Sequence, residues 1–183
     1  MSNTAVPVRP IAKGSIPKLW VGLGALALVA GGVAWVGTRA AQSTPQAFLA
    51  RNATESGVVT TASGLQVKTI TPGSGRQIGP NDGVMVEYEG RLLDGTTFDS
   101  TEGKGPAPML VGQVVPGFSE ALQLMQPGGA YRIWLPPALA YGDTPPPGAP
   151  IPPNSVLDFD VKILQVVPDA ALQMGSGGPP PGL

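Results

Sequence analysis

The 183-residue chain contains no cysteine and no histidine. Without cysteine, neither a disulfide framework nor a thiolate metal site can form. Without histidine, Ser-His-Asp and Cys-His catalysis are excluded, and so are most zinc sites. Any chemistry must therefore use carboxylates, hydroxyls, backbone groups or the shape of a cavity. The lack of cysteine also suits an oxidising compartment, where a free thiol is a liability.

Charge is sparse, and the two signs are unevenly distributed along the chain. Residues 1–51 carry five bases and no acid, whereas the remaining residues carry six bases and twelve acids. The overall charge of −1 therefore combines a basic head with a body of charge −6. Because the body is acidic and has no cluster of lysine or arginine, no nucleic-acid partner is expected.

A long uncharged run lies near the N-terminus, from Leu19 to Gly37. Nineteen helical residues at ~1.5 Å each come close to the ~30 Å of bilayer hydrocarbon. Trp20 and Trp35 lie near its two ends, where aromatic rings favour the membrane interface. We expect a transmembrane anchor at 19–37, with the tail 1–18 in the cytoplasm because it carries Arg9, Lys13 and Lys18.

Two alternatives to a retained anchor stay open. A cleaved signal peptide is one, because small residues flank Arg39 just before Ala41, although secretory apolar cores are usually shorter, at ~7–15 residues. A buried core helix is the other, and the uninterrupted apolar run argues against it. With either an anchor or a signal peptide, the body of the protein is exported.

After residue 37 we expect a linker with a short helix at 38–56, a folded domain at 57–168 and a disordered tail at 169–183. Thr44-Pro45 is typical of a helix start. Residues 58–70 predict one bent strand or two, and 84–93 alternate as in a half-buried strand closed by the hairpin dipeptide Asp94-Gly95. The tail is too rich in glycine and proline to bury a core.

One soluble helix is predicted, because Phe118, Ala121, Leu122 and Met125 share one helical stripe. Residues 131–135 and 156–167 return to the alternation of strands, with Asp158, Asp160 and Lys162 expected to point into solvent. Strands wrapped on one short helix indicate an α+β domain with a mostly antiparallel sheet.

Five blocks in a fixed order over about residues 57–167 resemble the FKBP-type peptidyl-prolyl cis–trans isomerases, particularly exported bacterial members similar to macrophage infectivity potentiators. The blocks are 86–90 (VEYEG), 93–100 (LDGTTFDS), 114–118 (VVPGF), 139–142 (LAYG) and 151–161 (IPPNSVLDFDV). The resemblance implies a curved antiparallel sheet around the 117–125 helix, with an apolar pocket between them. It implies no cofactor.

The family's pocket positions fall, by this resemblance, on Tyr88, Phe98, Asp99, Val114, Val115, Phe118, Tyr141, Ile151 and Phe159. Phe118 stands where the family usually has tryptophan. A second aromatic, expected ahead of a strand at 109–113, is replaced by Ala107 or Pro108. The proline-rich loop 143–150 is a residue longer than common versions.

The resemblance implies acceleration of Xaa-Pro rotation in exported proteins, which needs no nucleophile. We assign Phe118 as the floor for the proline ring, and the Val115 N–H and Tyr141 hydroxyl as donors to substrate carbonyls. The catalytic set comprises Asp99, Phe98 and Tyr141. Within this set, Asp99 orients the pocket by hydrogen bonding. Asp99 as a mere turn cap, and Tyr88 and Phe159 as simple core residues, are the alternative interpretations.

Two other functions stay open beside isomerisation. The same pocket could hold proline segments as a chaperone or assembly module with little turnover, or the domain could be a membrane-tethered spacer. The expected partners are proline-containing unfolded or exported polypeptides and macrolide inhibitors. Since 38–56 offers only a short helix in place of the relatives' long dimerisation arm, we expect a monomer in the bacterial inner membrane, with its domain in the periplasm.

Overall fold

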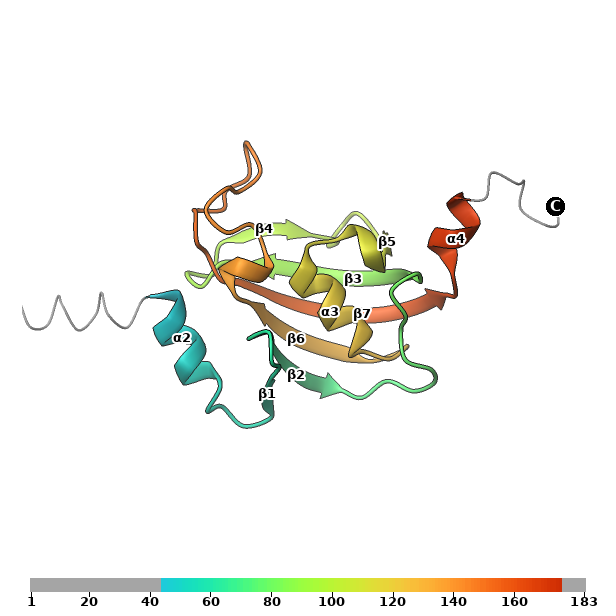
Figure 1. Cartoon of the computed structure of the whole chain (residues 1–183), viewed down its shortest axis with the longest axis horizontal. Helices are drawn as coiled ribbons and strands as arrows, with labels where there is room; N and C mark the ends of the chain where they lie inside the picture. The colour runs from blue at the N-terminus through green and yellow to red at the C-terminus, as the bar shows by residue number, and fades with distance from the viewer. Residues whose placement is uncertain (1–43, 176–183) are drawn as a thin grey trace, which may run out of the picture. The chain divides into compact units, whose positions relative to one another are not determined.

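The computed structural model describes residues 44–175, and its framework is an antiparallel sheet of seven strands (Figure 1). The strands follow the order β1-β2-β6-β7-β3-β4, and β5 pairs with β3 beside β4. Their bounds are β1 Val58–Thr60, β2 Gln66–Thr71, β3 Gly83–Arg91, β4 Thr97–Ser100, β5 Ala107–Leu110, β6 Ala130–Leu135 and β7 Leu157–Val167. Every pairing is antiparallel. The two longest strands, β3 and β7, pair along the whole length of β3.

Helix α3, Pro116–Gln123, lies across one face of this sheet, which we call the inner face (Figure 1). Proline occupies its first position, where the missing N–H costs nothing, and Phe118, Ala121 and Leu122 are buried. These side chains meet the inward residues of the strands, among them Val86, Ile133 and Ile163, none of which is exposed. The core therefore lies between α3 and the inner face.

Helix α2, Pro45–Asn52, is fixed to the domain through a buried glutamine on β2. The Gln66 side-chain amide donates to the Leu49 carbonyl at 2.7 Å, and its amide oxygen accepts from the Asn52 side chain at 2.8 Å. Gln66 is only 2% exposed, so both hydrogen bonds are shielded from water. The helix expected in the linker is present and ends earlier than Gly57.

The predicted α+β fold is confirmed, and the strands expected at 58–70, 84–93, 131–135 and 156–167 are all present. The segment 58–70 forms two strands, and Gly95 closes the β3–β4 hairpin with φ of 89°. Helix α4, Ala170–Gly175, overturns the expectation of disorder for the first residues of the tail. The Asp169 N–H donates to Asp82, and the Ala171 N–H donates to the Asn81 carbonyl, so this segment is tied to the start of β3.

No helix within residues 44–175 is both long and apolar enough to cross a membrane. The predicted anchor at 19–37 and the tail 1–18 lie outside the described residues, as does the part of the C-terminal tail from residue 176 onward.

Candidate active site

A hollow of about 120 Å³ opens on the inner face, between the N-terminus of α3 and strands β3, β4 and β5. Nine side chains line it: Tyr88, Phe98, Asp99, Met109, Val114, Val115, Phe118, Tyr141 and Phe159. Eight of these nine were predicted from the sequence. Phe98, Phe118 and Tyr141, which come from three separate segments, share one cavity as the resemblance requires.

Two positions differ from the sequence expectation. Ile151 is 7% exposed and packs in the core, and it does not line the hollow. Met109 lines the hollow where the wall was expected to be low at Ala107 or Pro108. The strand expected at 109–113 begins earlier, because β5 covers Ala107–Leu110 and a 3-10 turn follows at 111–113. The alternation of β5 then directs Met109 inward, opposite Val84.

Four aromatic rings form the floor and one side of the hollow, with Phe159 at their centre. Its ring centroid lies 5.1 Å from Phe118, 5.4 Å from Phe98 and 6.3 Å from Tyr88. The contacts with Phe118 and Phe98 are edge-to-face, the geometry favoured by the ring quadrupoles. This cluster fixes the rings in place, so the hollow has a rigid aromatic base.

Gly90 makes this ring packing possible. A Cβ atom at position 90 would lie 2.7 Å from both the Phe98 and Phe159 rings, closer than carbon atoms can approach. Gly90 belongs to β3 and pairs with Asp99 and Phe159 in the two neighbouring strands. The glycine in the 86–90 block therefore serves the packing of the site.

The polar part of the hollow is centred on the Asp99 carboxylate. It accepts hydrogen bonds from the Tyr88 hydroxyl and, at 2.9 Å, from the Ser100 N–H. Lys104 lies 3.7 Å from it, and both side chains of this ion pair are largely exposed. Burial and the adjacent Asp99 carboxylate raise the pKa of Tyr88, so its hydroxyl stays protonated and keeps donating.

Two further donors remain available at the rim. Among residues 44–175, neither the Val115 N–H nor the Tyr141 hydroxyl has a hydrogen-bond partner. Val115 immediately precedes α3, and no side chain caps the helix there. An apolar cavity with a few unused polar groups at its edge is the usual form of a small-ligand site.

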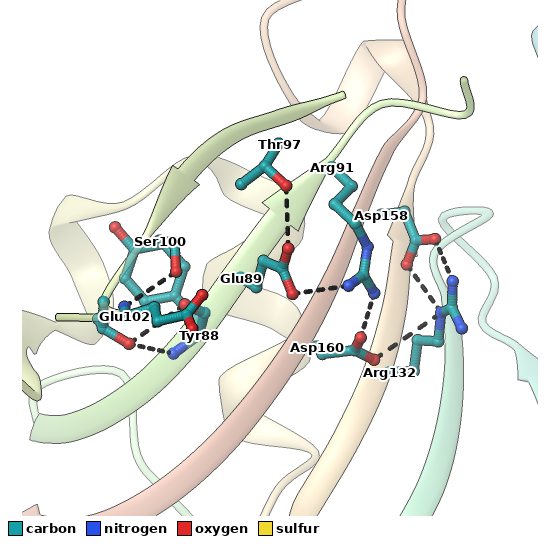
Figure 2. A network of polar contacts seen from close by, with 10 residues as sticks. Tyr88, Glu89, Arg91, Thr97, Ser100, Glu102, Arg132, Asp158 and Asp160 are labelled. Carbon is teal, nitrogen blue, oxygen red and sulfur yellow. Dashed lines mark hydrogen bonds and ion pairs between the residues drawn. The ribbon is translucent and has the colours of Figure 1, made fainter. Parts of the chain in front are cut away.

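The outer face of the sheet carries a ladder of paired charges instead (Figure 2). Arg91 contacts Glu89 at 2.7 Å and also Asp160, while Arg132 binds Asp158 through two hydrogen bonds of 2.6 and 2.9 Å. Larger hollows of about 720 and 480 Å³ lie against this face, but most of the charged side chains lining them are bound to one another. We therefore place the candidate site in the smaller inner hollow.

The expectation that Asp158 is solvated was wrong. It is 6% exposed, between the paired guanidinium of Arg132 and the buried Trp134 that faces it in the ladder. Arg132 also lies 5.4 Å from the centre of the Trp134 ring. Burial of this carboxylate is tolerated because Arg132 donates a hydrogen bond to each of its two oxygens.

Comparison with known proteins gives a consistent result. The family model described as FKBP-type peptidyl-prolyl cis-trans isomerase matches residues 74–164, and the model for the domain amino terminal to it matches residues 37–68. The Outer membrane protein MIP of Legionella longbeachae is 48% identical over 121 residues, which are 66% of this chain and 52% of that protein. The FKBP-type 22 kDa peptidyl-prolyl cis-trans isomerase of Escherichia coli is 44% identical over 66% of this chain and 58% of its own.

Solved structures agree with the sequence matches. FkpA from Escherichia coli superposes with a TM-score of 0.66 at 32% identity, covering 87% of this chain and 75% of that one. A peptidyl-prolyl cis-trans isomerase from Pseudomonas syringae pv. tomato gives 0.64 at 32% identity, covering 71% of this chain and 96% of that one. The chain spans about half the length of the curated relatives it matches. With both family models matched in order along the chain, it belongs to the FKBP-type peptidyl-prolyl cis-trans isomerase family.

Proposed function

We propose that this chain accelerates rotation about Xaa-Pro peptide bonds in unfolded or exported polypeptides. The observation that carries the proposal is the inner hollow, which joins an aromatic floor to donors at its rim. Its volume of about 120 Å³ is roughly four times the ~30 Å³ that one water occupies in the liquid. A pyrrolidine ring has a comparable size.

The chemistry requires no nucleophile and no metal. The peptide bond resists rotation by ~18–20 kcal/mol because its C–N bond has double-bond character, and Xaa-Pro bonds exchange over tens to hundreds of seconds. Water stabilises the planar amide, because it favours the charge-separated resonance form of the peptide bond. An apolar cavity removes that support and can bind the twisted amide more tightly than the planar one.

The side chains take separate roles in this proposal. Phe118 and Phe159 form the platform for the proline ring, with Phe98, Val114 and Met109 as walls. The Val115 N–H and Tyr141 hydroxyl donate to substrate carbonyls. Asp99 is held in place by the Tyr88 hydroxyl and presents a negative charge to the twisting amide. In this proposal Asp99 therefore does more than cap the turn.

The test uses the full-length chain, purified in mild detergent, and a proline tetrapeptide whose cis-to-trans exchange is followed optically. The wild type should accelerate exchange, and Asp99→Ala should lower kcat/KM about tenfold, the equivalent of ~1.4 kcal/mol in the transition state. Asp99 is largely exposed, so this variant should fold. Glu102→Ala, an exposed acid that does not line the hollow, is the matched control. Exchange at the uncatalysed rate with folded wild-type protein would remove the catalytic claim.

A second function, holding proline segments with little turnover, is favoured by one observation. The family resemblance assigns an aromatic side chain to one wall of the hollow, and here that wall is formed by the non-aromatic side chain of Met109. In this second proposal, the weaker wall reduces the preference for the twisted amide more than it reduces peptide binding. Comparing the rate acceleration with the affinity for the same peptides separates the two functions. Strong binding with negligible acceleration supports the holding function. Displacement of a bound peptide by a macrolide ligand of this family would place both functions in the inner hollow.

We also propose that residues 19–37 anchor the protein in the bacterial inner membrane, with the isomerase domain in the periplasm and the chain monomeric. The charge asymmetry around the apolar run supports this topology. Protease added to the outer side of spheroplasts should degrade the domain. Protection of the domain, or release of the protein by washing, would contradict the anchor, and light scattering of the purified chain tests the monomer.

A further inference from the structure

Sulfur chemistry in this chain belongs to methionine alone, because five methionines stand in a sequence without cysteine. The structure describes the side chains of three of them, Met85, Met109 and Met125. Met125 is fully buried in the core, whereas Met85 on β3 and Met109 on β5 are half-buried. Of these three, Met109 is the one that lines the inner hollow. An oxidisable thioether therefore lies at the candidate active site.

The position of Met109 leaves its side chain open to small molecules. Met109 is half-buried, whereas Phe118 and Phe159 on the floor of the hollow are only 4% and 7% exposed. The hollow has the volume of about four liquid water molecules, and hydrogen peroxide is little larger than one water. Peroxide can therefore reach Met109 in the folded protein, whereas Met125 becomes accessible only when the core opens.

The step expected at Met109 is a two-electron oxygen transfer. A lone pair of the sulfur attacks one oxygen of hydrogen peroxide, so an S–O bond forms while the O–O bond breaks. The other oxygen takes both protons and leaves as water, and the thioether becomes a sulfoxide. The sulfur is oxidised by two electrons and the peroxide is reduced by two. Methionine sulfoxide reductases restore the thioether with a dithiol as reductant, so the modification is reversible.

A sulfoxide at position 109 would place a strong hydrogen-bond acceptor in an apolar cavity. Its oxygen binds water that a proline ring must displace, and the prolyl amide has no N–H with which to replace the lost hydrogen bond. The Val115 N–H and the Tyr141 hydroxyl, which have no partner among residues 44–175, lie at the same hollow and can donate to the new oxygen. Both effects oppose substrate binding, because the first retains water in the hollow and the second occupies the donors assigned to substrate carbonyls.

We propose that Met109 is a modification site, at which peroxides form a sulfoxide that lowers the activity of the inner hollow and at which reduction restores that activity. This inference rests on the proposed function, because the activity that it regulates is that of the same hollow. The family resemblance assigns an aromatic ring to this wall, and a phenyl ring does not undergo this oxygen transfer. The sensitivity therefore follows from the residue at position 109 and is not a property of the fold.

The experiment treats the full-length chain in mild detergent with hydrogen peroxide and then removes the excess with catalase. Peptide mapping by mass spectrometry gives the sulfoxide fraction at each methionine, and the proline tetrapeptide assay gives kcat/KM. Met109 should be oxidised before Met125, and kcat/KM should fall about tenfold as oxidation of Met109 nears completion, mostly through a higher KM. The two methionine sulfoxide reductases, one for each epimer, should restore it. Undiminished activity in protein whose Met109 is oxidised would overturn the proposal.

Two variants, each compared with its own untreated activity, assign the effect to one residue. Met109→Leu keeps the wall apolar and close to its original volume, so it should retain its activity under the same treatment. Met85→Leu removes the half-buried methionine on the outer side of the same strand pair and should lose activity as the wild type does. An equal fractional loss in the wild type and Met109→Leu, or protection in Met85→Leu, would also contradict the assignment.

A binding measurement separates this inference from the proposed function. If the untreated wild type binds proline peptides but accelerates exchange in none of them, the catalytic function fails, and peptide affinity then replaces kcat/KM as the readout. Saturating peptide should slow sulfoxide formation at Met109 and leave Met85 unaffected, because the peptide covers the hollow. Oxidation of Met109 that peptide does not slow, and that does not weaken peptide binding, would overturn the inference alone. An untreated protein that neither turns over nor binds the peptides would overturn both.

Discussion

The inner and outer faces of the sheet use the same strands for opposite purposes. On the inner face, alternate residues of β3 and β7 place Tyr88 and Phe159 in an aromatic cluster around a hollow. On the outer face, the residues between them place Glu89, Arg91 and Asp160 in a ladder of ion pairs. Polar groups on the outer face are largely bound to one another, whereas the donors at the rim of the inner hollow are unused within the described residues.

This difference distinguishes a site from a structural network. Charged side chains that satisfy one another have little to offer a ligand, however large the hollow beside them. Unused donors next to an apolar cavity can form their hydrogen bonds with a substrate. Changes on the inner face should therefore affect both activity and stability, because the site and the core share this face, whereas changes on the outer face should affect stability alone.

The largest expected effect follows from removing the central ring of the inner cluster. Phe159→Ala should lower the free energy of unfolding by ~3–5 kcal/mol, because it leaves a cavity among the three neighbouring rings. Urea denaturation monitored by circular dichroism measures the change. Leu164→Ala, on the exposed side of the same strand, should cost less than ~1 kcal/mol. Similar losses in both variants would contradict the asymmetry of the two faces.

A smaller effect is expected from breaking the buried ion pair of the outer face. Asp158→Asn should lower the free energy of unfolding by ~1–3 kcal/mol, because Arg132 loses its closer charged partner, although it keeps Asp160 at 3.8 Å and is exposed enough to be hydrated. The kcat/KM of the folded variant should equal that of the wild type. A loss of activity beyond about threefold would show that the outer network also shapes the site.

A second buried carboxylate, Asp82, lies at the start of β3 and predicts sensitivity to acid. Burial opposes its ionisation, but hydrogen bonds from Arg76 and from the N–H groups of Gly79 and Asp169 outweigh burial and lower its pKa. Its stabilisation is therefore complete above the ordinary value of ~3.9 and is lost as the pH falls through the lowered pKa.

Asp82→Asn should accordingly be less stable than the wild type by ~1–3 kcal/mol at neutral pH, and the difference should shrink in acid. Urea titrations at several pH values provide the measurement. A difference that stays constant down to the acid unfolding of the wild type would show that the charge of Asp82 is not what stabilises this end of the sheet.

The smallest effect expected is that of pH on catalysis. The chain has no histidine, and the pKa of Tyr88 is raised, so its hydroxyl stays protonated well above neutrality. We expect kcat/KM to be constant between roughly pH 6 and 9. A bell-shaped profile in this range would indicate proton transfer in the rate-limiting step, which the proposed mechanism lacks.

Much of the fold was predictable, because alternation and helical periodicity give each segment one buried face. The residues of α3 and the inward residues of β6 and β7 follow this rule directly. Eight of the residues that line the inner hollow were expected from the family resemblance, and not from alternation or helical periodicity. Gly90 also belongs to one of the family motifs, although its contact with two rings is visible only in three dimensions.

The errors concern interactions between distant parts of the sequence. The pattern of β7 places Asp158 on the outer face, but it does not show that Arg132 and Trp134 cover it there. The composition of the tail does not reveal that Asp169 and Ala171 bind the turn before β3. Met109 was missed because β5 is short and starts two residues earlier than expected, which changes the residue facing the hollow.

The loop after Tyr141 has a consequence for the entropy of the site. A hydrogen bond of 2.6 Å from the Asn154 N–H to the Gly142 carbonyl closes it, and Ile151 secures it in the core. Six of its eleven residues, from Asp143 to Pro153, are prolines. Because each proline has a fixed φ, the unfolded loop has few conformations to lose. A long surface loop beside a binding hollow would ordinarily be costly to order, but this one is largely ordered by its own covalent structure.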